Sequence, residues 1–372
     1  MARRRVIKVG TSLLRGDAER PTAAVIADLA ASLARQQRRG DAIVLVSSGA
    51  VGLGCETLGL ATRPTEILAL QAAAAVGQGR LMGLYQDAFA VRGLRVAQVL
   101  LTRGDLASRR RYGNARLTLA QLLEWGVVPI VNENDTLATE ELRFGDNDTL
   151  SALVAVAVGA DELLLLTDVD SLYSGDPRTD PLARPIAQVR DLAELQRLSA
   201  IASGGGQWGT GGMATKMVAA RIATSSGIAV RLADGRDPAV LDGLFAGQSL
   251  GTEFLPSGSP LPERKGWLAH ALLPKGSLRV DRGAAEALLE RGASLLAVGI
   301  QAVEGEFSRQ EPVRVLREDG QEVGRGLSSL SSEELRRLLE SNREERRQRL
   351  AAIREAVVHR DHFVLTGAPS SP

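Results

Sequence analysis

The chain has 372 residues, of which 44% are hydrophobic and 24% charged, as in ordinary soluble globular proteins. Its net charge of +1 excludes a global field that would attract nucleic acid or an anionic membrane. Cys55 is the only cysteine, which excludes an internal disulfide and a cysteine-based zinc site and favours a reducing cytoplasm. At ~100–200 residues per domain, the length predicts two or three domains.

The first two-thirds of the chain alternate between strand and helix signals. Short apolar runs predict strands at Arg5–Val9, Ala42–Val46, Val96–Leu101, Val127–Val131, Leu163–Leu166 and Ile228–Leu232. Helical patterns predict helices at Ala23–Arg39, Pro64–Ala75, Asn114–Trp125, Thr149–Val158 and Met213–Ser225. Thr22 is the expected N-cap of the first helix. This order predicts an α/β domain with a mostly parallel sheet and helices on both faces, whose ligands bind beyond the carboxyl ends of the strands.

The composition changes at Pro256–Pro262, a linker rich in proline, serine and glycine. Beyond it, β-like runs occur at Gly276–Val280, Ser294–Val298 and Val313–Leu316. A long helix is expected over about Glu333–Ala356, and Ser331 with Glu334 forms a capping-box pattern for it. We therefore divide the chain into a first domain over 1–255, a linker over 256–264, a small β-rich domain over 265–366 and a disordered tail over 367–372.

No membrane segment or export signal is expected. The longest apolar stretch, Leu150–Ala160, is shorter than the ~20 residues that a membrane-spanning helix needs. The basic start at Arg3–Arg5 resembles that of a signal peptide, but Lys8 places a charge inside what would be its apolar core.

Three glycine-rich loops, Lys8–Ser12, Ser47–Gly54 and Gly209–Lys216, lie beside strand ends or helix starts. Glycine lets backbone N–H groups approach a phosphate closely, and a helix N-terminus adds a favourable dipole. The P-loop spacing is absent, and each loop alone could be a plain structural turn. Lysine occupies only four of 45 basic positions, and Lys8 and Lys216 both fall in these loops. Where arginine is the usual cation, this placement favours phosphate binding by a compact ammonium group.

Polar residues also gather after the predicted strands. Asn132–Thr136 follows one strand, and Gly145–Asp148 opens the next helix. Amides and carboxylates at such positions suit recognition of an ammonium or hydroxyl group, or the orientation of nearby cations. The alternative is that Asn147 or Asp148 only caps its helix. Thr167–Asp168 ends another strand, either as a nucleotide contact or as a plain turn.

The remaining candidate residues favour structural roles. The three histidines, His270, His359 and His362, lie in the C-terminal part and pair with no acid-rich loop. Cys55 has no histidine base in the α/β part and is expected to be a small core residue. Arg109–Arg111 is expected to form a solvated face.

Two lysines on phosphate-type loops and an acidic loop indicate phosphoryl transfer from a nucleotide. In this arrangement the chain resembles the amino-acid kinase family, and within it the members that phosphorylate L-glutamate at the start of proline biosynthesis. The matching segments keep the family order and are Ile7–Ser12, Val46–Ala50, Val128–Asp135, Phe144–Asp148, Leu165–Asp168 and Gly209–Lys216. Leu278–Ala284 and Arg291–Leu296 are similar to the PUA domain, a small β-rich module of RNA-modifying enzymes. Gln310 stands where that pattern leads us to expect glycine.

The resemblance implies transfer of the γ-phosphoryl group of ATP to the side-chain carboxylate of L-glutamate, with Mg²⁺ held through the nucleotide's phosphates and water. It implies that Lys8 and Lys216 flank the transferred group and that Asp148 orients both ammonium groups. It assigns the binding of glutamate to Ser48, Asp135 and Asn147. It assigns the binding of ATP to Lys8, Thr167, Asp168, Thr210, Gly211, Gly212, Met213, Ala214, Thr215 and Lys216. No protein ligand of Mg²⁺ is assigned.

Two other functions compete with this interpretation. A kinase acting on N-acetylglutamate would leave Asp135 without a purpose, because an acetylated amine carries no positive charge. An RNA-binding protein with a vestigial kinase domain is disfavoured, because the chain from Lys265 onward balances 17 basic against 16 acidic residues and has only three aromatic ones. Nucleic acid and membrane are therefore not expected as partners. The resemblance further implies a homo-oligomer formed through the kinase domains and feedback inhibition by proline.

Overall fold

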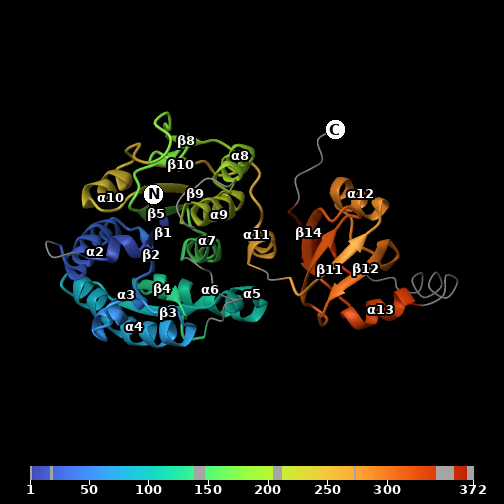
Figure 1. Cartoon of the computed structure of the whole chain (residues 1–372), viewed down its shortest axis with the longest axis horizontal. Coiled ribbons are helices and arrows are strands. Elements are labelled where there is room, and N and C mark those ends of the chain that lie inside the picture. Colours follow the sequence, from blue (N-terminus) through green and yellow to red (C-terminus); the bar gives the residue numbers. More distant parts are fainter. Residues whose placement is uncertain are drawn as a thin grey trace. The chain divides into compact units, whose positions relative to one another are not determined.

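The computed structural model describes residues 2–16, 20–137, 147–203, 212–271, 274–340 and 356–366. The chain divides into two compact units, Met1–Glu263 and Arg264–Pro372. In Figure 1 the first unit runs from blue to yellow and the second is orange to red.

An eight-stranded sheet forms the centre of the first unit. Its strands are β1 (Arg4–Val9), β2 (Ala42–Ser47), β3 (Val96–Leu101), β4 (Val128–Glu133), β5 (Glu162–Thr167), β8 (Gln188–Val189), β9 (Ala229–Asp234) and β10 (Thr252–Phe254). They lie in the order β3-β4-β2-β1-β5-β9-β10-β8 and run parallel from β3 to β9, with β10 antiparallel to β9. A separate antiparallel pair joins β6 (Leu172–Tyr173) to β7 (Pro185–Ile186).

Helices cover both faces of this sheet (Figure 1). One layer contains α1 (Thr11–Leu14), α2 (Thr22–Arg38), α3 (Ala50–Thr57), α4 (Ile67–Ala90) and α10 (Pro238–Phe245). The other contains α6 (Arg109–Glu124) preceded by α5 (Arg103–Ala107), α7 (Asn147–Val158), α8 (Leu192–Ser203) and α9 (Gly212–Ser225). Ile7, Leu45 and Phe89 belong to the apolar core between the sheet and the first layer. Between their end residues, β2 and β5 are continuous apolar runs, as expected for strands of which neither face meets water. The parallel sheet with helices on both faces confirms the predicted α/β architecture.

The long helix α4 differs most from its prediction. It begins at Ile67 rather than Pro64 and continues past Ala75 to Ala90. Gly77 does not break it, because this residue is a contact point: a Cβ there would lie 1.8 Å from the backbone oxygen of Ala50 in α3. Among the described residues, α4 alone is long and apolar enough to cross a membrane. It packs on α2 and α3, so it is no clear membrane span.

Two other helix starts also correct the prediction. The N-cap of α2 is Pro21, and Thr22 is already the first helical residue. The helix predicted from Asn114 begins at Arg109, so the arginine run forms its first turn.

The second unit contains a five-stranded sheet in the order β12-β11-β13-β14-β15. Its elements are α11 (Glu263–His270), β11 (Gly276–Val280), α12 (Arg282–Arg291), β12 (Ile300–Gly305), β13 (Pro312–Leu316), β14 (Glu322–Leu327), α13 (Ser332–Glu340), β15 (Phe363–Leu365) and 3-10 turns at Ala297–Gly299 and Arg360–His362. The strand predicted at Ser294–Val298 is wrong, because this stretch makes one bridge from Leu295 to Val358 and then turns.

The predicted capping box of α13 is confirmed. The backbone N–H of Ser331 donates to Glu334 Oε2 at 2.8 Å, and the N–H of Glu334 donates to Ser331 Oγ at 3.2 Å. Hydrogen bonds from Arg309 and Ser331 lower the pKa of Glu334 to about 2. Residues 341–355 of the predicted helix, and the predicted tail over 367–372, lie outside the described residues.

Several strands of the first unit place polar residues at one edge of the sheet. Lys8 is the fifth residue of β1, Ser47 ends β2, Glu133 ends β4 and Thr167 ends β5. Because these strands are parallel, all four residues lie at or near their carboxyl ends, where an α/β sheet binds ligands.

Candidate active site

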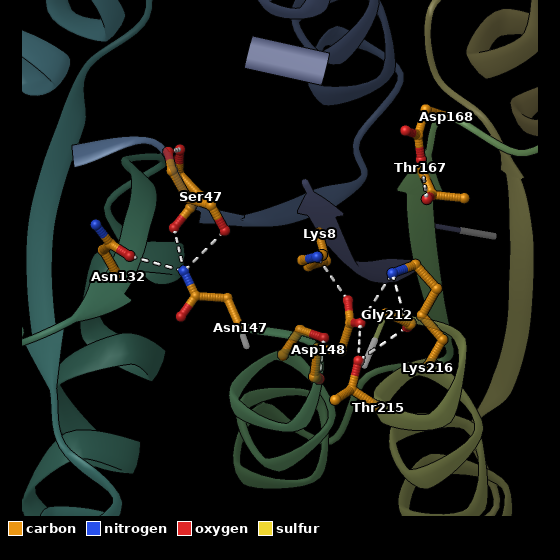
Figure 2. Close-up of polar contacts among 12 residues, drawn as sticks. Lys8, Ser47, Asn132, Asn147, Asp148, Thr167, Asp168, Gly212, Thr215 and Lys216 are labelled. Carbon is orange, nitrogen blue, oxygen red and sulfur yellow. Dashed lines mark hydrogen bonds and ion pairs between the residues drawn. The ribbon is translucent and has the colours of Figure 1, made fainter. Parts of the chain in front are cut away.

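A buried ion-pair cluster lies where β1, α7 and α9 meet (Figure 2). Lys8 Nζ lies 2.6 Å from Asp148 Oδ1, and Lys216 Nζ lies 3.1 Å from Asp148 Oδ2. Lys8 is 3% exposed, Lys216 7% and Asp148 0%. One buried carboxylate thus contacts two buried ammonium groups, which it holds close together. Two ammonium groups fixed in this way suit the binding of a phosphoryl group.

The first turn of α9 holds Lys216 in this cluster. Its Nζ also donates to the backbone oxygen of Gly212 at 3.1 Å. The Thr215 hydroxyl lies 2.8 Å from Asp148 Oδ2 and 2.9 Å from the same Gly212 oxygen. Met213 and Ala214 belong to this turn. Thr210 and Gly211, the other residues predicted for this loop, lie outside the described residues, as do Gly145 and Asp146.

A second cluster brings together Ser48, Asn132 and Asn147, which are far apart in the sequence. Asn147 Nδ2 lies 2.7 Å from the backbone oxygen of Ser47, 2.8 Å from Asn132 Oδ1 and 3.1 Å from Ser48 Oγ. Ser48, Asp135 and Asn147 all line one pocket of about 630 Å³. The three residues predicted to bind the substrate therefore share one cavity.

The wall of this pocket includes residues that the sequence analysis did not select, among them Arg15 and Arg63. Gly49, the N-cap residue of α3, lines the pocket and has a φ of +104°, a left-handed conformation that favours glycine. Cys55 is half-buried on the same wall, so its prediction as a core residue is wrong. It belongs to α3, which also contributes Ala50, Leu53 and Glu56 to this wall.

The predicted nucleotide residues end β5. Thr167 is buried and its hydroxyl donates to Asp168 Oδ1 at 3.1 Å, and Figure 2 shows both on the far side of Lys8 from Asn147. At the end of the neighbouring β9, the Arg236 side chain pairs with Asp234. This contact lowers the pKa of Asp234, and Asp168 and Asp170 contribute to the raised pKa of Arg236. The sequence signal for Asp234 was its place just after a predicted strand.

All three histidines fall in the second unit. Among the described residues, no group of three histidine, cysteine, aspartate or glutamate side chains could hold a metal ion.

Comparison with known proteins places this arrangement in a family. Residues 3–234 match the Amino acid kinase family, and residues 276–348 match the PUA domain. The chain belongs to the amino acid kinase family. A "Glutamate 5-kinase" of Prochlorococcus marinus (strain MIT 9313) is 58% identical over 98% of this chain and 99% of its own length. Another of Synechococcus sp. (strain CC9902) is 59% identical over 97% of this chain and 98% of its own length.

The kinase unit also resembles solved structures at the level of fold. A carbamate kinase of Giardia lamblia bound to AMP-PNP is 15% identical, with a TM-score of 0.51 over 69% of this chain and 99% of its own. This likeness confirms the amino-acid kinase fold of the first unit, and the PUA match confirms the identity of the second.

Proposed function

We propose that this kinase transfers the γ-phosphoryl group of ATP to the side-chain carboxylate of L-glutamate, giving L-glutamyl 5-phosphate for proline biosynthesis. The high identity to proteins named Glutamate 5-kinase over nearly the whole chain supports the substrate. The observation that carries the chemistry is the pair of buried ammonium groups on one carboxylate, Lys8 and Lys216 on Asp148.

This reaction needs no general base. A glutamate side chain has a pKa near ~4.3, so the nucleophile is already ionised at neutral pH. Catalysis then consists of positioning the reactants and stabilising charge on the transferred group. Lys8 and Lys216 supply that stabilisation from opposite sides of Asp148, which keeps both ammonium groups fixed before substrate arrives.

The two substrates approach this cluster from opposite sides. Asp135 matches the ammonium group of glutamate, and Ser48 and Asn147 hold the same molecule in the pocket of about 630 Å³. Thr167, Asp168 and the α9 loop, including Thr210 and Gly211, hold ATP. Figure 2 supports this division, because Asn147 lies on one side of Lys8 and Thr167, Asp168 and Lys216 lie on the other.

The donor groups fit a Mg²⁺ ion that enters with the nucleotide. Mg²⁺ usually keeps several waters and binds nucleotide phosphates, so it does not need a dedicated protein cage. Asp148, the most buried carboxylate of the site, is already engaged by two lysines. The ion would neutralise phosphate charge, while the lysines and Asp148 position the transferred group.

The same proposal includes a homo-oligomer formed through the kinase units, in the cytoplasm. Large apolar side chains are exposed along α3 and α4 and the segment between them, namely Leu58, Leu60, Leu68 and Val76. Leu68 is 79% exposed, and several large apolar side chains exposed in one part of the chain favour burial against a second copy. Feedback inhibition by proline is proposed from the family resemblance, and neither nucleic acid nor a membrane is proposed as a partner.

A coupled assay of ADP release tests the function. We expect release that depends on L-glutamate and is not supported by N-acetyl-L-glutamate, because Asp135 requires a positive charge. Release supported by the acetylated compound alone would favour the rival kinase, and no release with either compound would favour a vestigial kinase domain.

A further inference from the structure

Three oxygen atoms lie within hydrogen-bonding distance of the Asn147 amide nitrogen, which carries only two protons. Its nitrogen faces the Ser47 carbonyl, Asn132 Oδ1 and Ser48 Oγ, at 2.7, 2.8 and 3.1 Å. An amide nitrogen donates two hydrogen bonds. The two shorter contacts therefore account for both protons of the amide.

The backbone fixes the orientation of Asn132. Its Oδ1 accepts a hydrogen bond from the N–H of Glu133 at 2.9 Å, a contact that only the oxygen can make. Its Nδ2 therefore points the other way, where it donates to Gln78 Oε1 at 2.8 Å. Gln78 belongs to α4, 54 residues earlier in the chain. Two amide hydrogen bonds thus run in one direction, from Asn147 to Asn132 and from Asn132 to Gln78.

This direction decides which atom Asn147 offers to a ligand. Its nitrogen is occupied by Ser47 and Asn132, and Figure 2 shows its oxygen on the side away from both. Asn147 lines the pocket, so the oxygen is the atom that remains for the substrate. An amide oxygen accepts a hydrogen bond from an ammonium group, whereas a turned amide would offer N–H donors instead.

We propose that Gln78 is a positioning residue: by accepting from Asn132, it keeps the Asn147 oxygen turned toward the ammonium group of the amino-acid substrate. This inference rests on the proposed function, in which Asn147 and Asp135 hold L-glutamate. Without the Gln78 acceptor, the Nδ2 of Asn132, a residue only 2% exposed, is left with a buried proton and no partner. A buried unsatisfied donor is costly, so the Asn132 amide is held less firmly without Gln78, and the Asn147 amide that donates to it is held less firmly in turn.

Three variants of the full chain separate positioning from mere packing. Gln78→Met keeps the length of the side chain and removes the acceptor. Gln78→Glu keeps an acceptor oxygen for Asn132 and should restore the orientation. Gln86→Met is the matched control, because Gln86 is exposed on the same helix.

Steady-state ADP release at varied L-glutamate and varied ATP, with the melting temperature of each variant, tests the proposal. We expect Gln78→Met to raise the KM for glutamate about tenfold, the loss of roughly one hydrogen bond, while kcat and the KM for ATP stay within about twofold. Gln78→Glu should return the KM for glutamate to within about threefold of wild type, and Gln86→Met should match wild type.

An unchanged glutamate KM in Gln78→Met would overturn the proposal. So would equal losses toward both substrates in Gln78→Met and Gln78→Glu, because these would mark a structural role. A wild-type chain that releases no ADP with glutamate would instead reject the proposed function, and the inference with it.

Discussion

The site depends on two side chains whose importance is visible in the composition of the chain. Lys8 and Lys216 are two of only four lysines, and both contact the buried carboxylate of Asp148. The rarity of lysine and its place in glycine-rich loops predicted the pair. Gln78 had no such signal, because it lies 54 residues from its partner Asn132 and only the folded chain brings them together.

Replacing either lysine of the cluster by arginine should lower kcat by roughly 10²–10³, the scale of one preorganised donor. Lys8 is 3% exposed and already 2.6 Å from Asp148, so a planar guanidinium group with five donors does not fit the same space. Lys265→Arg and Lys275→Arg, both in the second unit, are the matched controls and should leave kcat unchanged. The kcat of all four variants is measured by glutamate-dependent ADP release. Near-wild-type kcat in both Lys8→Arg and Lys216→Arg would reject the two lysines as the phosphoryl-binding groups.

Asp135 should determine the affinity for the amino acid. We expect Asp135→Asn to raise the KM for glutamate about tenfold or more and to leave the KM for ATP within about twofold, because the amide keeps the shape and removes the charge that matches an ammonium group. Asp168→Asn is the complementary control and should raise the KM for ATP instead. Equal losses toward both substrates in Asp135→Asn would indicate a disturbed loop and contradict the assignment.

At the scale of elements, buried strands were the most predictable part of the fold. β3 spans Val96–Leu101 as predicted, and β5 contains the predicted run Leu163–Leu166, which is continuous and apolar because this strand is buried on both faces. The helices α10 and α12 were missed although both carry N-cap signals: Asp237 accepts from the N–H of Ala239 at 2.8 Å, and Asp281 from that of Ala284 at 2.7 Å. The end of α4 was not predictable locally, because the close contact between Gly77 and α3 exists only in the folded chain.

Gln310 offers an element-scale test. It is the one described residue other than glycine with a positive φ, +65°, at the position where the sequence led us to expect glycine. Gln310→Gly should stabilise the second unit by about 0.5–1 kcal/mol, because relief of the left-handed strain outweighs the added freedom of the unfolded chain. Gln321→Gly, an exposed site in the same unit without a positive φ, should lower stability instead. Thermal unfolding measures both, and a lower melting temperature for Gln310→Gly would contradict the prediction.

At the scale of the whole molecule, the linker after Leu255 is bound to the kinase unit at two points. The N–H of Ser257 donates to the backbone oxygen of Thr224 at 2.9 Å, and that of Leu261 to Ser225 at 2.8 Å. The composition of the linker predicted a boundary but carried no sign of these contacts. They argue for a boundary after the proline-rich segment rather than before it.

Two truncations test this boundary. Fragments over residues 1–255 and 1–262 should both fold and bind ATP, because the eight-stranded sheet is complete before Leu255. The longer fragment keeps both linker hydrogen bonds and should melt a few degrees higher. Calorimetry and nucleotide titration measure the two properties. If the 1–262 fragment is insoluble or does not bind ATP, the second unit is needed for the kinase fold.

The most direct test of the phosphoryl-transfer account is to trap its product. Hydroxylamine attacks an acyl phosphate and leaves a stable hydroxamate, so the acceptor carboxylate is marked at the moment it is activated. With the full chain, ATP, Mg²⁺ and L-glutamate, the account predicts the hydroxamate of the glutamate side chain in an amount equal to the ADP released, and a loss of roughly 10²–10³ in its rate of formation in Lys216→Arg. ADP release without hydroxamate, or hydroxamate on the α-carboxylate, would contradict it.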